Sequence, residues 1–255
     1  SVPSVSIVIL TRNRPAYLPR AIRSAGAQTH AELELVLVRD GGEPLDPESR
    51  AAIDALDFPA LLVERDGPAE GVARSRNEGI GSARADAVAI LDDDDTWDPP
   101  HVAHLAALFD RDPSVDVAYS DARIRLEDGG GERVIARDFD LAVFSRDDYA
   151  PPSTMLIRRA AFERFGVFDP DFTCSEDWEW MLRVARRGGV ITRSPGVTAT
   201  ILIHKGAHSA LQLARLEERK RCLELLSKRH DLPPLTPKTY WEVAETVCPG
   251  SGTAR

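Results

Sequence analysis

The sequence predicts an α/β fold built around a parallel sheet. Through its first half, short apolar runs alternate with segments whose apolar residues recur at helical spacing, and this alternation is typical of parallel strands joined by helical crossovers. Two of the apolar runs lead directly into polar segments, at 40–42 (Asp-Gly-Gly) and at 92–95 (four aspartates). Because ligands of such sheets bind beyond the carboxyl ends of the strands, we expect both segments to border a functional site.

The elements of the first half can be placed in order. Residues 5–10 (Val-Ser-Ile-Val-Ile-Leu) are nearly all apolar, which indicates a buried parallel strand. Residues 15–29 are expected to form a helix, because Leu18, Ala21 and Ile22 recur at three- and four-residue steps. Further strands are predicted at 33–38, 60–64 and 87–91, and further helices at 47–56, 71–83 and 99–109.

The second half predicts a mixed arrangement of strands and helices. Strands are expected at 115–120, 153–157 and 197–203, a glycine turn between extended segments at 129–131, and helices at 160–165, 177–187 and 208–230. The tail from Gly250 is expected to fray. The leucines of the 208–230 helix could pack on their own domain or on a second subunit, which leaves a homodimer open.

Composition and charge narrow the functional classes. The chain has 255 residues, 43% of them hydrophobic, and 32 Lys plus Arg against 41 Asp plus Glu give a net charge of −9. This is a globular composition, and the acidic balance argues against nucleic acid and anionic membranes as partners. No apolar run is long enough for a transmembrane helix, and residues 1–5 lack the pattern of a signal peptide, although the missing initial Met leaves open a longer protein. Three widely spaced cysteines without a CxxC pair indicate no disulfide framework or zinc site, so we expect a cytoplasmic location.

The aspartate run is the sharpest feature of the sequence. Asp92, Asp93, Asp94, Asp95 and Asp98 place five carboxylates in seven positions. Carboxylates this close raise one another's pKa unless a cation neutralises them, and their oxygens suit hard cations such as Mg²⁺, Mn²⁺ or Ca²⁺. An EF-hand does not fit, because the turn glycine and the twelfth-position glutamate are both missing. The alternative is a solvated acidic loop that stabilises the N-terminus of the next helix.

Three other positions are candidates for chemistry. Asp40 follows a strand and precedes two glycines, so it could accept from a nucleobase imide or a ribose hydroxyl, or simply form a turn. Glu176 and Asp177 open a helix, where acidic residues are stabilising in any case, but one of them could act as a general base. His204 ends a predicted strand and could be a ligand or a structural residue. The segment after the first strand, 11–15, has no GxGxxG pattern, which disfavours a dinucleotide fold.

Taken together and in order, these segments resemble glycosyltransferase family 2, over about residues 3–208. The matching pieces are Val5-Ser6-Ile7-Val8-Ile9-Leu10-Thr11-Arg12-Asn13-Arg14, Ala27-Gln28-Thr29, Asp40-Gly41-Gly42, Gly71-Val72-Ala73-Arg74-Ser75-Arg76-Asn77-Glu78-Gly79, Leu91-Asp92-Asp93-Asp94-Asp95-Thr96-Trp97, Ser153-Thr154, Phe165-Gly166-Val167-Phe168-Asp169 and Glu176-Asp177-Trp178.

The resemblance implies the GT-A fold. This is a Rossmann-like, mostly parallel sheet flanked by helices, with a mixed acceptor-side half and a C-terminal helix. It implies a single domain over residues 1–255, with a nucleotide-sugar-binding half at 1–110, an acceptor and catalytic half at 111–206, and a C-terminal helix and tail at 207–255.

The resemblance also implies roles for individual residues. Nucleotide-binding positions are Thr11, Asn13, Asp40, Arg76, Asn77, Asp92 and Asp93. Candidate metal ligands are Asp94, Asp95 and His204, and which of Asp93, Asp94 and Asp95 holds the metal is left open. Asp177 matches the general base, with Glu176 beside it. Two positions depart from the family pattern, since Arg39 stands where an Asp is common and Asp93 where a Ser is frequent.

The implied activity is inverting sugar transfer. The donor would be a nucleoside-diphosphate sugar (a UDP-, GDP- or dTDP-sugar), the acceptor a hydroxyl-bearing molecule, and the cofactor Mn²⁺ or Mg²⁺. A divalent ion would neutralise charge that develops on the diphosphate, and a base on the opposite side would take the proton of the acceptor hydroxyl. Two alternatives remain: a non-catalytic nucleotide-sugar or carbohydrate-binding module, and a sugar nucleotidyltransferase, which would require a glycine-rich basic first loop.

Overall fold

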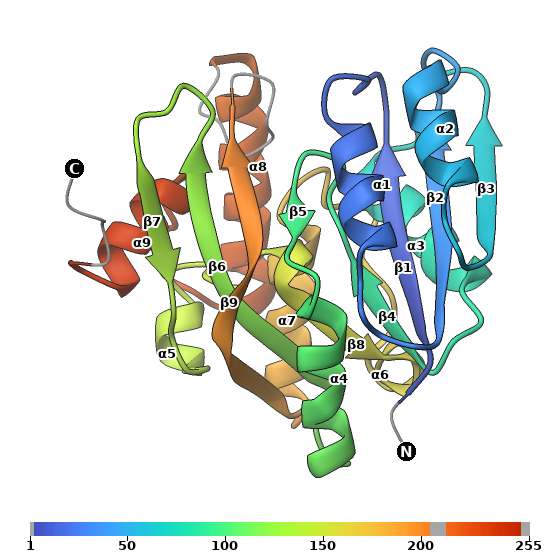
Figure 1. The fold of residues 1–255 in the computed structure, drawn as a ribbon. Helices are drawn as coiled ribbons and strands as arrows, with labels where there is room; N and C mark the ends of the chain where they lie inside the picture. The colour runs from blue at the N-terminus through green and yellow to red at the C-terminus, as the bar shows by residue number, and fades with distance from the viewer. Residues whose placement is uncertain (1–2, 205–212, 251–255) are drawn as a thin grey trace.

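A single sheet runs through the molecule (Figure 1). The computed structural model describes residues 3–204 and 213–250. Within these residues the strands are β1 (Val5–Thr11), β2 (Leu33–Asp40), β3 (Ala60–Arg65), β4 (Ala87–Ile90), β5 (Thr96–Trp97), β6 (Val117–Leu126), β7 (Glu132–Ile135), β8 (Met155–Arg158) and β9 (Ile191–Ile203). The helices are α1 (Leu18–Gly26), α2 (Pro47–Asp54), α3 (Val72–Ser82), α4 (His101–Arg111), α5 (Leu141–Phe144), α6 (Arg159–Phe165), α7 (Glu176–Arg186), α8 (Leu213–His230) and α9 (Tyr240–Val247), with a 3₁₀ turn at Pro152–Thr154.

The N-terminal half of the sheet is parallel, as predicted. The strand order is β3-β2-β1-β4-β8-β6-β9-β5, with β7 paired to β6. β1 pairs in parallel with β2 on one side and with β4 on the other. The chain therefore winds outward from β1 to β3 and then returns to the opposite side of β1. The carboxyl ends of β1 and β4 flank this reversal, which is where α/β sheets bind ligands.

The other half of the sheet is mixed, which also confirms the prediction. β8 is antiparallel to both β4 and β6, whereas β9 is parallel to β6. β9 begins at Ile191, six residues before the predicted start, because Pro195 and Gly196 are absorbed in a bulge. Gly196 has a φ of 141° and its N–H donates to Asp121 Oδ2 at 3.0 Å. The Pro-Gly pair therefore bends the strand without ending it.

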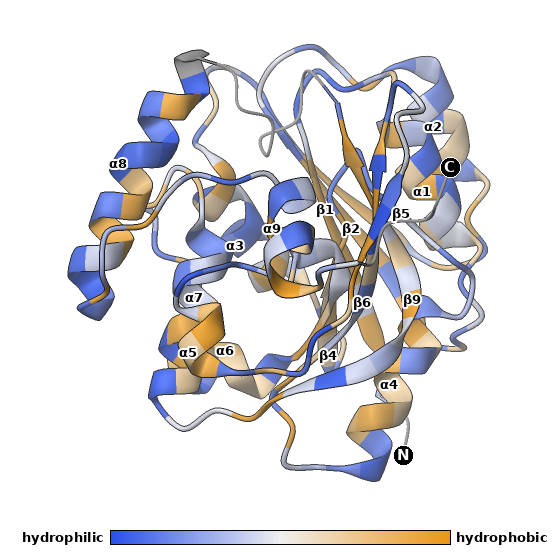
Figure 2. Ribbon diagram, turned by 90° about the vertical axis from the view of Figure 1, so that its left-hand side faces the viewer, coloured by the Kyte–Doolittle hydropathy of each residue, from blue (hydrophilic) through white to orange (hydrophobic). Residues whose placement is uncertain are grey.

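Helices cover both faces of the sheet (Figure 2). α1, α2 and α4 pack on one face, where they bury Val5, Ile7 and Ile9 of β1. α3, α6, α7, α8 and α9 pack on the other face, which Val8 joins. Adjacent residues of β1 thus face opposite layers, which is why apolar residues follow one another from Ile7 to Leu10.

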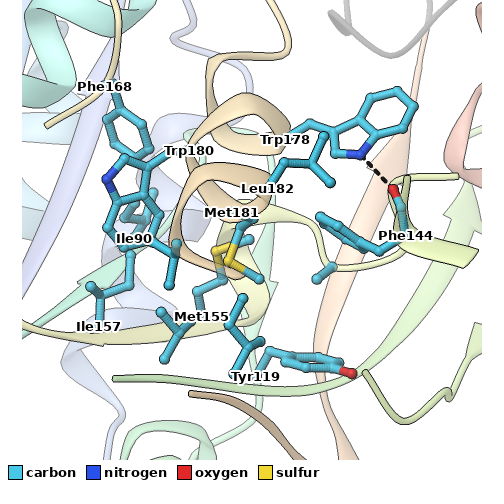
Figure 3. Packing of buried hydrophobic residues seen from close by; sticks show 14 of the residues in the cluster. Ile90, Tyr119, Phe144, Met155, Ile157, Phe168, Trp178, Trp180, Met181 and Leu182 are labelled. Atoms are coloured by element: carbon cyan, nitrogen blue, oxygen red, sulfur yellow. Dashed lines mark hydrogen bonds between the residues drawn. The ribbon is translucent and has the colours of Figure 1, made fainter. Parts of the chain in front are cut away.

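The larger core lies beneath α7 (Figure 3). Trp178, Trp180, Met181 and Leu182 of α7 pack over Met155 of β8 and its neighbours. The two indole N–H groups donate to backbone carbonyls, Trp178 to Phe144 at 2.7 Å and Trp180 to Gly166 at 2.6 Å. Aromatic packing with satisfied polar atoms gives the N-terminus of α7 a fixed position.

Several boundaries differ from the predictions. α1 begins at Leu18 rather than at residue 15, and α5, α9 and the short β5 were not predicted. The predicted 208–230 helix is seen as α8, with residues 208–212 lying outside the described part of the chain. Leu223 and Leu226 of α8 are buried in the core of their own chain, which settles the packing of that face. Within residues 3–204 and 213–250, none of the helices combines the length and the apolar character that crossing a bilayer requires.

Candidate active site

A cavity of about 930 Å³ opens beyond the carboxyl ends of β1 and β4. Its walls include residues 10–14 at the end of β1 and just beyond it, residues 92–95 after β4, the start of α7 and parts of the C-terminal segment. The structure brings the predicted site residues together around this cavity, with Asn77 and His204 outside the described lining. His204 nevertheless contacts a lining residue, Asp94.

Asp93 joins the two strand ends. Thr11, the last residue of β1, donates its hydroxyl to Asp93 Oδ2 at 2.8 Å. Both side chains are buried. Burial, reinforced by the charge of Asp94, raises the pKa of Asp93 to about 7. The hydrogen bond therefore spans the point where the winding of the sheet reverses.

Asp94 is held by a histidine and an arginine. Its Oδ2 lies 2.8 Å from His204 Nε2 and accepts from an Arg14 guanidinium N–H at 3.1 Å. Burial opposes ionisation of Asp94, but the bond with His204 and the charge of Arg14 outweigh it and lower the pKa of this carboxyl. His204 reaches this position from the end of β9, and its ring stacks on Tyr17 with centroids 4.2 Å apart. The arrangement places an ionised carboxylate and an imidazole nitrogen side by side.

Asp95 has a different environment. Its Oδ2 accepts from the Ser153 hydroxyl at 2.7 Å, and its Oδ1 accepts from the Leu202 backbone N–H at 3.0 Å. Burial raises the pKa of Asp95 well above its usual range. Both oxygens thus tie the end of β4 to the 152–154 turn and to β9, so the geometry gives Asp95 a structural role.

Arg76 bridges the two acidic walls of the cavity. From α3, its guanidinium donates to Asp92 Oδ1 at 2.5 Å and to Glu176. Burial, together with the charges of Asp177 and Asp92, raises the pKa of Glu176 to about 8, while the Arg76 charge acts in the opposite direction. Burial also raises the pKa of Asp177. Asp177 is therefore a carboxylate whose proton affinity exceeds that of an exposed aspartate.

Asp40 and Asn13 organise neighbouring loops. Asp40 lines the cavity, but its oxygens accept from the backbone N–H groups of Glu70 and Gly71, at 2.9 and 3.0 Å, and from Arg65 at 3.0 Å. Asn13 Oδ1 accepts from the Glu43 N–H at 2.7 Å. Both side chains thus shape the cavity wall, and their contact with a nucleotide stays a prediction.

Asn77 lies away from the described lining. Its side-chain amide donates to the Phe168 carbonyl at 2.8 Å and accepts from the Phe168 N–H at 2.9 Å. This two-point contact fixes the segment between α6 and α7 on α3. Asn77 therefore helps to hold the segment that leads into α7 in place next to the cavity.

The C-terminal segment supplies residues that sequence reasoning missed. Lys238 Nζ contacts Asp147 Oδ1 at 2.5 Å, and Tyr240 donates to Asp148 Oδ2 at 3.2 Å. All four residues line the cavity. A signal was present in the sequence, because Thr239 and Glu242 form a capping box at the start of α9.

The metal prediction rests on two protein donors. Among the described residues, no group of three or more His, Cys, Asp or Glu side chains is arranged to hold a metal ion. Asp94 and His204 do present adjacent oxygen and nitrogen atoms, which are donors that Mn²⁺ accepts. Such a pair suits an ion whose other positions are filled by water and substrate phosphates.

Sequence comparisons place this chain among glycosyltransferases. The family model described as "Glycosyl transferase family 2" matches residues 6–166. An uncharacterized glycosyltransferase of Bacillus subtilis, YwdF, is 29% identical over 246 residues, which cover 92% of this chain and 87% of that protein. A PGL/p-HBAD biosynthesis glycosyltransferase of Mycobacterium bovis is 28% identical over 196 residues, which cover 76% of this chain and 74% of that protein.

Solved structures agree on the fold. S. aureus TarS 1-349 in complex with UDP-GlcNAc superposes with a TM-score of 0.69 at 17% identity, over 91% of this chain and 68% of that one. The mannosyltransferase PcManGT of Pyrobaculum calidifontis, solved with GDP-Man and Mn²⁺, superposes with a TM-score of 0.67 at 20% identity, over 92% of this chain and 67% of that one. The chain spans only 39% of a longer TarS chain. The likeness confirms the GT-A fold, and because the family model matches more than half of the sequence, the chain belongs to glycosyltransferase family 2 and is a glycosyltransferase.

Proposed function

We propose that the protein transfers a sugar from a nucleoside-diphosphate sugar to an acceptor hydroxyl, with inversion, with help from a divalent metal, and with Asp177 as the general base. The observation that carries the proposal is that one cavity is lined both by Asp94, which contacts His204, and by Asp177, a buried carboxyl group whose pKa burial raises. UDP-GlcNAc and GDP-Man in the two neighbouring structures support the class of donor.

The leaving group requires positive charge. A nucleoside diphosphate departs with a charge of about −3, and a divalent ion bound there would stabilise the charge that develops on its oxygens. Asp94 and His204 would hold this Mn²⁺ or Mg²⁺. Arg14, whose guanidinium N–H lies 3.1 Å from Asp94 and 3.3 Å from His204 Nε2, brings a fixed positive charge to the same corner.

The acceptor hydroxyl requires a base. Asp177 stands at the start of α7, which the aromatic core beneath that helix keeps in place. Arg76 lies next to it and pairs with Glu176 and Asp92, so that it offsets part of the negative charge of this wall. Asp177 would take the proton as the hydroxyl oxygen attacks the anomeric carbon from the side opposite the diphosphate, which inverts the configuration.

Purified protein tests these points directly. UDP-, GDP- and dTDP-sugars are mixed with a panel of hydroxylated acceptors, and release of nucleoside diphosphate is measured with Mn²⁺ and with EDTA. Asp177→Asn should lower the rate about 10² to 10⁴-fold, whereas Asp54→Asn, at an exposed position of α2, should leave it unchanged. NMR of the product gives the anomeric configuration.

The outcomes separate the parts of the proposal. Undiminished transfer by Asp177→Asn removes this residue from the base role, and full activity in EDTA removes the metal. Release of pyrophosphate from a sugar phosphate and a nucleoside triphosphate would identify a nucleotidyltransferase instead.

A further inference from the structure

The C-terminal segment forms part of the wall of the same cavity that the loops at 10–14 and 92–95 border. Thr236, Lys238, Tyr240 and Val243 line the cavity together with Asp148, which precedes the 152–154 turn. Two contacts hold the segment there, from Lys238 to Asp147 and from Tyr240 to Asp148. A segment that begins beyond the family-model match at residue 166 therefore shapes the same cavity as Asp177.

Helix α9 fixes the position of Tyr240. The Arg133 guanidinium of β7 lies 4.1 Å above the Trp241 ring and donates to the Trp241 carbonyl at 2.8 Å. The Thr239 and Glu242 capping box closes the first turn of the helix. Tyr240 thus projects from an element that is attached to the edge of the sheet, and its hydroxyl reaches the cavity in a defined place.

Polar atoms with spare bonding capacity gather at this wall. Tyr240 donates its O–H to Asp148 Oδ2, which leaves the phenol oxygen able to accept. Asp148 Oδ1 accepts from the Ala150 N–H at 3.3 Å, and each carboxylate oxygen can take another hydrogen bond. Arg219 of α8 donates through one terminal nitrogen to the Lys238 carbonyl at 2.5 Å. Its other terminal nitrogen is buried and has no hydrogen-bond partner in the part of the chain that the structure describes, and Arg219 itself lines the cavity.

The buried nitrogen points to a ligand. A buried donor without a partner is destabilising, and an oxygen that reached this guanidinium from a bound ligand would satisfy it. Burial raises the pKa of both Asp148 and Tyr240, and the negative charge of Asp177, which lines the same cavity, raises both further. Tyr240 therefore remains protonated and uncharged at neutral pH.

From these contacts we propose that Asp148, Tyr240 and Arg219 bind the acceptor, and that the acceptor is a neutral, hydroxyl-rich molecule such as a saccharide or polyol. The inference rests on the proposed transfer reaction and deepens it. A hydroxyl group both donates and accepts, so it can donate to Asp148 or the Tyr240 oxygen and accept from Arg219. The wall also brings acidic and basic side chains together, since Asp148 lies beside Lys238 and Arg219 at the same cavity, and a hydroxyl group can bond to both kinds.

The test separates acceptor binding from donor binding. Initial rates are measured with methyl glycosides of common hexoses, glycerol, glycerol phosphate and 1-octanol as acceptors, and the Kd of the nucleoside diphosphate is measured by calorimetry. Tyr240→Phe and Asp148→Asn should raise the KM of the neutral acceptor about 10- to 100-fold, as expected for the loss of one or two polar contacts, with the nucleoside diphosphate Kd unchanged. Glu245→Gln, on the same helix but paired to Arg133 outside the cavity, is the matched control and should behave as wild type.

Each outcome decides the inference. An unchanged acceptor KM in both variants overturns it, as does transfer to 1-octanol or glycerol phosphate in preference to the neutral glycosides and glycerol, or no transfer to any neutral acceptor. Wild-type protein that fails to bind a nucleoside diphosphate would instead contradict the proposed function. Melting temperatures within about 2 °C of wild type show that the variants are folded.

Discussion

Ser153→Ala tests whether the acidic run is held in place by the protein itself. Ser153 is fully buried, donates its hydroxyl to Asp95 Oδ2 at 2.7 Å, and accepts from the Asp92 N–H at 3.0 Å. Alanine removes both bonds and leaves a buried carboxyl oxygen without this donor. Each buried group left unsatisfied costs about 1–3 kcal/mol. Asp92 borders the cavity, where water can replace its lost partner, so we expect the Asp95 oxygen to account for most of the loss, about 1–3 kcal/mol.

The assay is equilibrium unfolding in urea, followed by tryptophan fluorescence. A loss of this size with an unchanged m-value lowers the urea concentration at the unfolding midpoint. The melting temperature should fall by roughly 2–4 °C for each kcal/mol that is lost. Ser114→Ala is the matched control, because Ser114 also donates to an aspartate, Asp112 at 2.6 Å, but at an exposed position. We expect it to change the free energy of unfolding by less than about 0.5 kcal/mol. Equal losses in the two variants would show that the buried network does not hold the run.

Three further predictions concern individual site residues. Folded Asp93 keeps its proton up to about pH 7, whereas the unfolded residue loses it near pH 4, so Asp93 should lower the free energy of unfolding as pH rises through this window. In urea titrations at pH 5 and 8, Asp93→Asn should therefore show a smaller fall than wild type, because the other buried acids still contribute theirs, and equal falls in the two proteins would contradict the assignment. Asn77→Ala breaks both bonds to Phe168 and should cost about 1–3 kcal/mol of stability, with little change in the nucleoside diphosphate Kd measured by calorimetry. A large loss of affinity would instead support the contact with the nucleotide that the sequence predicts for Asn77. His204→Ala should weaken Mn²⁺ binding at least about tenfold in electron paramagnetic resonance titrations, and unchanged affinity would exclude the Asp94–His204 pair as the metal site.

The sequence was sufficient for the first half of the fold because local signals agree there. Apolar strands, helical periodicity and polar strand ends all point to one parallel sheet, and the structure places 92–95 at the end of β4 as expected. The mixed half was harder. The Pro195-Gly196 pair reads as a break, and only pairing with β6 shows that β9 continues through it.

The separate roles of the aspartates could not be read from spacing. Asp93, Asp94 and Asp95 are adjacent in the chain and identical in chemistry. Their difference comes from partners far away in sequence, since Asp95 meets Ser153 and Leu202, 58 and 107 positions later. The contribution of the C-terminal segment was missed for the same reason, because the capping box predicts helix α9 but not the cavity that it borders.

These partners also change what the acidic run requires from a cation. Four adjacent carboxylates would repel one another in water, yet each is met by a different element of the fold. Asp92 pairs with Arg76, Asp93 with Thr11, Asp94 with Arg14 and His204, and Asp95 with Ser153 and Leu202.

The run therefore acts first as the junction at which β1, α3, β9 and the 152–154 turn meet β4. Burial raises the pKa of Asp92, Asp93 and Asp95, whereas that of Asp94 is lowered. Only one of the four thus combines an ionised oxygen with a neighbouring imidazole at the cavity. For the metal-assisted transfer that we propose, this arrangement favours a divalent ion that arrives with the substrate diphosphate over a resident ion that holds the fold together.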